Sequence, residues 1–256
     1  MSSEDILSKP QPPSDQRAAY GADPSQFVEV RLPSRKEPHP VLLYIHGGYW
    51  RAKYDLAHAG HLCEAMRGSG VATFNVEYRR VGNEGGGWPG TFADIRSAYR
   101  FIREKASQFH LDIKRLAVMG HSAGGQLALC LAAHEESLKS AISLAGVVDL
   151  KKAFALHLSH DAVVEFLGGK PEEVSDHYRE ADPMELRIAH ARQWLLHGIE
   201  DDTVPPQFSR DYSTEKRKNG EQVELVEIVH AGHFELIDPA SEAFPKVKAA
   251  VLSAVG

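Results

Sequence analysis

The stretch MGHSAGGQLA, residues 119–128, lies between an apolar strand-like run (RLAVM) and an apolar helix-like run (QLALCLAA). Glycine and serine are poor choices inside either element, so the chain must turn sharply here. The segment Gly120-His121-Ser122-Ala123-Gly124 fits the pattern G-x-S-x-G. In a strand–turn–helix setting this pattern predicts a nucleophile elbow, with a strained serine projecting from the top of a sheet. The plainer alternative is that Ser122 only caps the helix.

The rest of the chain alternates strand-like and helix-like segments, which predicts an α/β fold with a mostly parallel, doubly wound sheet and helices on both faces. The apolar run VLLYI, residues 41–45, is typical of a strand buried on both sides. Strands are also predicted at 27–32 (as an edge strand), 71–78, 141–146, 192–198 and 223–229, and helices at 58–70, 91–109, 206–220 and 239–255.

Two segments depart from this rhythm within what we take as a single domain of residues 1–256. Residues 147–190 contain short helix-like pieces and no good strand, so we predict a small helical insertion that lies like a lid over the carboxyl edge of the sheet. Residues 1–25 begin with a polar, proline-containing stretch and are predicted to be a loose N-terminal leader.

Composition limits the classes of partner. The 256 residues carry a formal net charge of −6, which argues against a nucleic-acid or anionic membrane surface. The sequence has neither a signal-peptide pattern nor an apolar run long enough to span a bilayer, so a cytoplasmic protein is expected. Cys63 and Cys130 lie among apolar residues and are predicted to be buried free thiols. Three H-x-x-H pairs lack the glutamate of H-E-x-x-H, so no metal and no cofactor are expected.

A serine hydroxyl becomes a good nucleophile only beside a base that an acid orients. In chain order after Ser122, the turn G-I-E-D-D-T-V-P supplies an acid and the segment V-H-A-G-H-F supplies a base. We prefer Asp201 to its neighbour Asp202 because of its position in the turn. We prefer His233 to His230 because His233 should lie in a loop beyond the strand.

A second glycine turn, His46-Gly47-Gly48-Tyr49-Trp50, ends the predicted strand at 41–45. Acyl transfer builds negative charge on a carbonyl oxygen, which backbone N–H groups stabilise. We expect Gly48 and Tyr49 to supply such groups together with Ala123, and Gly47 to permit the turn. The alternative is that these glycines only close the strand. His46 is expected to brace the loop by hydrogen bonding.

Together, G-H-S-A-G, H-G-G-Y-W, the acidic turn and A-G-H-F resemble the α/β-hydrolase superfamily, across residues 27–255. The H-G-G-x-W form is similar to arylformamidases (kynurenine formamidases) and to bacterial carboxylesterases. The resemblance implies a serine hydrolase with Ser122, Asp201 and His233 as its catalytic set and residues 47–49 as its oxyanion loop. Its substrate would be a small ester or an N-formyl aryl amine. A dedicated kynurenine formamidase and a non-catalytic ligand-binding module remain alternatives, and the oligomeric state is left open.

The glycine-rich stretch at 77–92 carries Trp88, and we expect it to border the pocket together with Trp50 and Tyr49. Aromatic side chains at a pocket mouth would suit an aryl or planar acyl substrate. Trp88 could equally cover the sheet edge. Within the same stretch, Glu77 and Arg79 are expected to form a structural ion pair.

Overall fold

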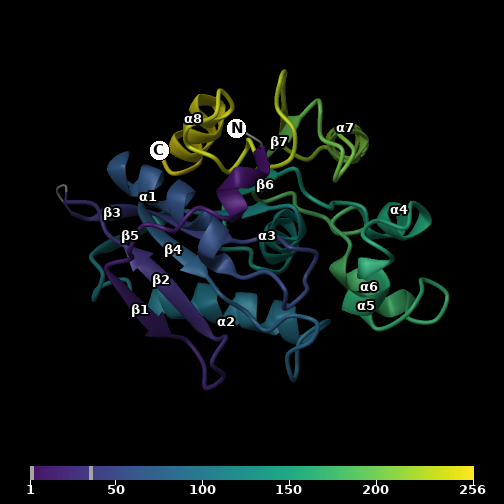
Figure 1. Cartoon of the computed structure of the whole chain (residues 1–256), viewed down its shortest axis with the longest axis horizontal. Helices are drawn as coiled ribbons and strands as arrows, with labels where there is room; N and C mark the ends of the chain where they lie inside the picture. Colours follow the sequence, from purple (N-terminus) through teal and green to yellow (C-terminus); the bar gives the residue numbers. More distant parts are fainter. Residues whose placement is uncertain (1–2, 35–36) are drawn as a thin grey trace.

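An eight-stranded sheet runs through the middle of the molecule (Figure 1). The computed structural model describes residues 3–34 and 37–256. In spatial order the strands are β1 (Gln16–Ala19), β2 (Phe27–Arg31), β4 (Ala72–Val76), β3 (His39–Ile45), β5 (Leu111–His121), β6 (Ser140–Leu144), β7 (Arg192–Gly198) and β8 (Val223–Ile228). From β4 to β8 all neighbours are parallel, whereas β1 and β2 are antiparallel to their neighbours.

The sheet is covered on both faces because its central strands are apolar on both sides. Along β3, Val41, Leu43 and Ile45 join one buried cluster, and Leu42 and Tyr44 join the other. The first cluster includes side chains of α2 (Gly90–Glu104), α3 (Ala123–His134) and α7 (Gln207–Lys218), and the second includes side chains of α1 (Gly60–Gly68) and α8 (Phe244–Ala254). The predicted α/β-hydrolase architecture, with its mostly parallel sheet, is confirmed.

The N-terminal segment differs from the predicted loose leader. It contains the 3₁₀ helix η1 (Ser3–Leu7), whose Ile6 is fully buried, and strand β1, which pairs with β2. The strand at 27–31 is therefore not the edge strand that we predicted, because β1 lies outside it. Strand β1 has the sequence QRAA and is mostly exposed, so it joins the sheet through backbone pairing and gives no hydrophobic signal.

The region 147–190 folds into three short helices, α4 (Leu150–Ala155), α5 (Ala162–Leu167) and α6 (Ser175–Ala181), which lie together at one side of the sheet (Figure 1). Helix α5 contacts the loops that follow β3 and β4. The Phe166 ring stacks on Trp50 with centroids 4.5 Å apart, and the Phe166 carbonyl accepts a hydrogen bond from the backbone N–H of Trp88 at 2.7 Å. The insertion thus buttresses these loops.

Cys63 and Cys130 are buried free thiols, as predicted. Burial raises the pKa of the Cys63 thiol to about 12, which keeps it protonated and unreactive. None of the helices in the described residues has both the length and the apolar character needed to cross a membrane.

Candidate active site

Ser122 occupies the sharp turn between β5, which ends at His121, and α3, which begins at Ala123. Its backbone has φ 57° and ψ −120°, a conformation that non-glycine residues rarely adopt. The Ser122 N–H donates to the carbonyl of Leu144 on the neighbouring strand at 2.8 Å, which holds the turn in place. The strained elbow predicted from G-x-S-x-G is therefore present.

Two glycines make this turn sterically possible. A Cβ on Gly120 would lie 2.0 Å from the carbonyl oxygen of Gly124, and a Cβ on Gly124 would lie 2.1 Å from the carbonyl oxygen of Ile45. Both carbonyl oxygens belong to the backbone of closely packed elements, α3 and β3, and cannot move away. The motif glycines are required by close packing.

We expect Gly124→Ala to destabilise the protein by about 2–4 kcal/mol, because the added methyl overlaps backbone. Gly68 is the matched control: it ends α1, and a Cβ there meets no atom within 4 Å. Gly68→Ala should stabilise the protein by about 0.5 kcal/mol. Urea denaturation of both variants measures the difference. Equal effects of the two substitutions would contradict this steric account.

Asp201 lies in the turn after β7 and is 6% exposed. Its Oδ1 accepts hydrogen bonds from the backbone N–H groups of Thr203 at 2.9 Å and Val204 at 2.8 Å. Its Oδ2 lies 2.7 Å from Nδ1 of His233 and 3.2 Å from Nε2 of His197. Burial alone would raise the pKa of Asp201, but the hydrogen bonds from His197 and His233 outweigh it and hold that pKa below its ordinary value.

The two alternative residues lie elsewhere. Asp202 is exposed, and its only side-chain partner in the described structure is the hydroxyl of Thr203 at 3.4 Å. The side chain of His230 is 81% exposed and lies 3.3 Å from Glu200. His230 belongs to a turn beyond β8, because β8 ends at Ile228. The structure thus brings Asp201 and His233 together.

Ser122 and His233 line one cavity of about 300 Å³. Its other lining residues are Leu7, Gly48, Tyr49, Tyr54, His58, His121, Thr203 and Phe234. The side chains of Ser122 and His233 form no hydrogen bond with each other in the described structure. Catalytic hydrogen bonds of this kind are often long until a substrate binds. The cavity places a hydroxyl and a carboxylate-oriented imidazole around a space of small-molecule size.

Two further imidazoles in the cavity wall stay neutral. Burial, with a smaller contribution from nearby His46, lowers the pKa of His58 to about 3. Burial and the neighbouring His233 lower the pKa of His121 well below its ordinary value. His121 Nε2 lies 3.0 Å from the His233 carbonyl oxygen, and the two rings lie 4.5 Å apart. His121 therefore packs against His233 without adding charge beside it.

The loop after β3 approaches the elbow closely. A Cβ on Gly47 would lie 2.9 Å from the carbonyl oxygen of His121, so only glycine permits this contact. Gly48 and Tyr49 have positive φ values of 111° and 50°, and both line the cavity. Within the described residues, the backbone N–H groups of Gly48, Tyr49 and Ala123 donate to no protein acceptor. Free amides beside a serine hydroxyl are the donors that a developing oxyanion needs.

The tyrosine of this loop ties it to the acidic turn. The Tyr49 hydroxyl donates to the carbonyl of Thr203 at 3.0 Å. Burial and the charge of Asp201 raise the pKa of Tyr49 to about 12, so the phenol stays protonated and keeps donating. The fourth residue of the H-G-G-Y-W motif, Tyr49, thus connects the two loops that carry Gly48 and Asp201.

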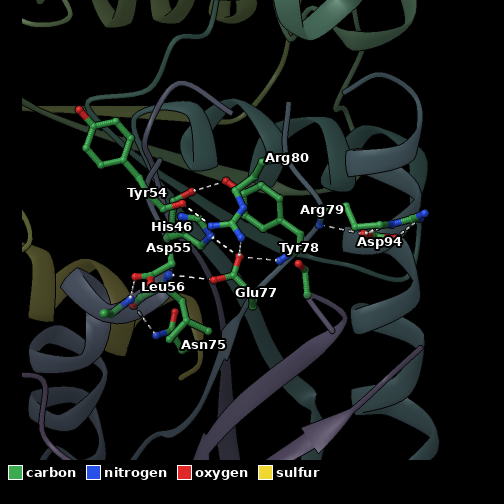
Figure 2. A network of polar contacts seen from close by, with 12 residues as sticks. His46, Tyr54, Asp55, Leu56, Asn75, Glu77, Tyr78, Arg79, Arg80 and Asp94 are labelled. Atoms are coloured by element: carbon green, nitrogen blue, oxygen red, sulfur yellow. Dashed lines mark hydrogen bonds and ion pairs between the residues drawn. The ribbon is translucent and has the colours of Figure 1, made fainter. Parts of the chain in front are cut away.

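His46 holds the loop after β3 in place through a buried network of hydrogen bonds and ion pairs (Figure 2). Its Nε2 lies 3.2 Å from Oε1 of Glu77, which also pairs with Arg80 at 3.1 Å, and Oε2 of Glu77 accepts the backbone N–H of Leu56 at 3.1 Å. Burial opposes the charge of Glu77, but His46 and Arg80 keep its pKa below the ordinary value. The network fixes the segment between the glycine turn and η2 (Leu56–Ala59).

The ion pair expected between Glu77 and Arg79 is wrong. Arg79 points the other way and binds Asp94 of α2 at 2.6 Å, as Figure 2 shows. In an extended strand, residues two apart such as 77 and 79 would share a side. Strand β4 ends at Val76, so this alternation does not extend to residues 77–80. Arg80 takes the place predicted for Arg79.

The two tryptophans predicted to line the pocket do not reach it. Trp50 is 1% exposed, and its indole N–H donates to Gln126 of α3 at 3.0 Å. Trp88 stacks on Phe92 with ring centroids 5.2 Å apart. Large aromatic side chains gain stability by burying apolar surface, and Phe166 of the insertion packs against both tryptophans. The stretch at 77–92 and the insertion at 147–190 contribute no residue to the cavity wall.

Sequence reasoning missed several residues of the cavity. Thr203 and Phe234 adjoin the motifs that carry Asp201 and His233, so their proximity was available as a signal. Tyr54 and His58 follow the glycine turn by only a few residues. Leu7 had no signal, because nothing local links the N-terminus to the site. Within residues 3–34 and 37–256, no group of three or more His, Cys, Asp or Glu side chains is arranged to hold a metal ion.

Residues 28–215 match the BD-FAE family model, which is well over half of the chain. The chain belongs to the BD-FAE family. The BD-FAE match spans the loop after β3, the serine elbow and the turn that carries Asp201, and it ends before the His233 loop.

Among curated proteins, esterase LipC of Mycobacterium tuberculosis (strain ATCC 25618 / H37Rv) is 26% identical over 250 residues, which cover 88% of this BD-FAE chain and 60% of LipC. The chain spans about half to three fifths of the length of LipC and of two further Mycobacterium tuberculosis relatives, esterase LipQ and the probable carboxylic ester hydrolase LipM.

Two solved structures share the fold. One is a truncated form of a carbohydrate esterase from gut microbiota, with a TM-score of 0.82 and 18% identity, covering 96% of this chain and 97% of the other. The second is esterase Est2 of the Planctomycetes species Thermogutta terrifontis with propionate bound. Its TM-score is 0.75 at 23% identity, and the match covers 94% of this chain and 93% of Est2. Both place the BD-FAE chain in the α/β-hydrolase fold.

Proposed function

We propose that this chain is a serine carboxylesterase that cleaves a small ester through an acyl-enzyme intermediate. The observation that carries the proposal is the 2.7 Å contact between Asp201 and His233 on the wall of the cavity that Ser122 enters from a strained elbow. Membership of the BD-FAE family and the similarity to esterase LipC support the same activity.

In the first step, the Ser122 hydroxyl attacks the ester carbonyl and His233 takes its proton. Because Nδ1 of His233 donates to the carboxylate of Asp201, its Nε2 is left unprotonated and able to accept that proton. The depressed pKa of Asp201 keeps the carboxylate ionised, so it orients the imidazole and stabilises the imidazolium that forms.

The tetrahedral intermediate places a negative charge on the former carbonyl oxygen. The free N–H groups of Gly48, Tyr49 and Ala123 would stabilise this oxygen, and each such donor contributes about 3 kcal/mol to the transition state. His233 then gives its proton to the departing alcohol. Water, activated by the same imidazole, releases the acid from Ser122.

A fluorophosphonate probe tests the nucleophile directly. We expect one adduct per chain, located by peptide mass spectrometry on Ser122, because only an activated serine attacks the phosphorus quickly. Ser107→Ala is the control variant, since Ser107 is an exposed serine in the turn after α2 and does not line the cavity, and it should label as the wild type does. Labelling that persists in Ser122→Ala, or is absent from the native protein, would contradict the proposal. The second result would favour a non-catalytic ligand-binding module.

The two candidate substrates differ in their leaving group, which is an alcohol in an ester and an aryl amine in a formamide. The H-G-G-Y-W motif also suits hydrolysis of an N-formyl aryl amine, as in a kynurenine formamidase, because His233 can protonate an amine as it does an alcohol. The ester is our first choice, because membership of the BD-FAE family and the similarity to esterase LipC support ester hydrolysis. Values of kcat/KM for N-formylkynurenine and phenyl acetate, measured side by side, decide between the two.

A further inference from the structure

One residue of the cavity wall comes from the N-terminal part of the chain, far in sequence from Ser122, Asp201 and His233. Leu7, at the end of η1, lines the cavity although its side chain is 38% exposed. Among the residues that line the cavity in the described structure, Leu7 is the one aliphatic side chain. It lies at the rim, with one side toward the cavity and the other toward solvent.

The segment that carries Leu7 is fixed in place on both sides. Ile6, the preceding residue, is fully buried in the same cluster as Leu236 and Ile237. Lys9 forms an ion pair with Asp238 at 3.0 Å. Figure 1 shows the N-terminal helix beside the segment that leads into α8. Because the flanking residues are anchored, the position of Leu7 is set by the fold.

These anchors place the segment on one particular side of the site. Leu236, Ile237 and Asp238 belong to the same loop as His233 and Phe234, which both line the cavity. On its other side η1 packs against η2, whose His58 also lines the cavity. In an acyl transfer the leaving group lies next to the imidazole that protonates it. Leu7 therefore borders the space for the leaving alcohol.

We propose that the N-terminal segment at residues 5–9 is the wall of the leaving-group subsite, and that Leu7 sets the size of alcohol that the enzyme accepts. This inference rests on the proposed esterase function. The small helical insertion at 147–190, which we predicted to lie like a lid over the carboxyl edge of the sheet, contributes no residue to the cavity wall, whereas the N-terminal segment contributes Leu7.

The test uses two acetates that differ in bulk but hardly in leaving-group acidity, phenyl acetate and 4-tert-butylphenyl acetate. The measured quantity is kcat/KM for 4-tert-butylphenyl acetate divided by kcat/KM for phenyl acetate. Leu7→Ala removes apolar bulk from the rim and should raise this ratio by about fivefold. Leu7→Trp adds bulk and should lower the ratio by about the same factor. Both acetates form the same acetyl-enzyme, so the effect should appear in kcat/KM and leave the rate of deacylation unchanged.

Two comparisons make the test specific. Leu252→Ala is the matched control, because Leu252 is 39% exposed on α8 and does not line the cavity, so the ratio should stay at the wild-type value. Phenyl butyrate against phenyl acetate reports the acyl side, and this ratio should change less than twofold in both Leu7 variants. Thermal unfolding confirms that each variant is folded.

The outcomes separate the two proposals. If the wild type hydrolyses neither acetate, the esterase function fails and the leaving-group subsite falls with it. If the wild type is active but neither Leu7 variant changes the alcohol ratio, or if only the acyl ratio changes, the subsite assignment is overturned while the esterase function stands.

Discussion

Ser122→Ala should lower kcat/KM for phenyl acetate by about 10⁵-fold or more, because the substitution removes the atom that forms the acyl-enzyme. The residual rate would come from the amide donors of Gly48, Tyr49 and Ala123, which still bind the oxyanion and position an attacking water. Initial rates of phenol release, measured at protein concentrations high enough to detect slow turnover, give the ratio.

The same substitution should leave stability nearly unchanged. The Ser122 hydroxyl makes no hydrogen bond to a protein atom in the described structure, and alanine occupies the strained φ of 57° about as well as serine does. The melting temperature should therefore change by less than about 2 °C. A variant that is folded and retains more than about 1% of wild-type kcat/KM would remove Ser122 from the mechanism.

A feature of this site could be predicted from the sequence when the residues that cause it lie close together in the chain. The elbow was predictable because its glycines, its serine and its flanking apolar runs lie within a few residues of one another. The steric reason holds in the structure, since a Cβ on Gly120 or Gly124 would overlap backbone atoms. Strand β3 was equally visible, because burial on both faces leaves an unbroken apolar run.

Features that depend on tertiary contacts were missed. Trp50 directly follows the glycine turn of residues 47–49 in sequence, but its indole packs on Phe166, 116 positions later, and that contact decides where it points. Strand β1 forms only because β2 offers it a backbone partner. Leu7 reaches the cavity because Ile6 is buried in the same cluster as Leu236, and because Lys9 pairs with Asp238, more than two hundred residues away in sequence. Neither the composition of the chain nor the periodicity of its apolar residues indicates such contacts between distant segments.

Asp201→Asn should lower kcat/KM for phenyl acetate by about 10⁴-fold, while Asp202→Asn should have less than a twofold effect. An asparagine at 201 can keep the acceptor that binds the N–H groups of Thr203 and Val204, but its NH₂ group would then face Nδ1 of His233. Nδ1 must accept that hydrogen bond, so the proton moves to Nε2, and the imidazole can no longer take a proton from Ser122.

The adjacent aspartates form a matched pair for this experiment. Asp202 carries the same charge one residue away, but it is exposed and does not contact His233. A long-range charge effect would act on both variants, whereas an orienting hydrogen bond acts only through Asp201. Because its hydrogen bonds hold the pKa of Asp201 below the ordinary value, the wild-type carboxylate is ionised at pH 6 as it is at pH 8. The loss in Asp201→Asn should therefore be seen at both pH values. A large loss in Asp202→Asn with little loss in Asp201→Asn would reassign the acid to Asp202.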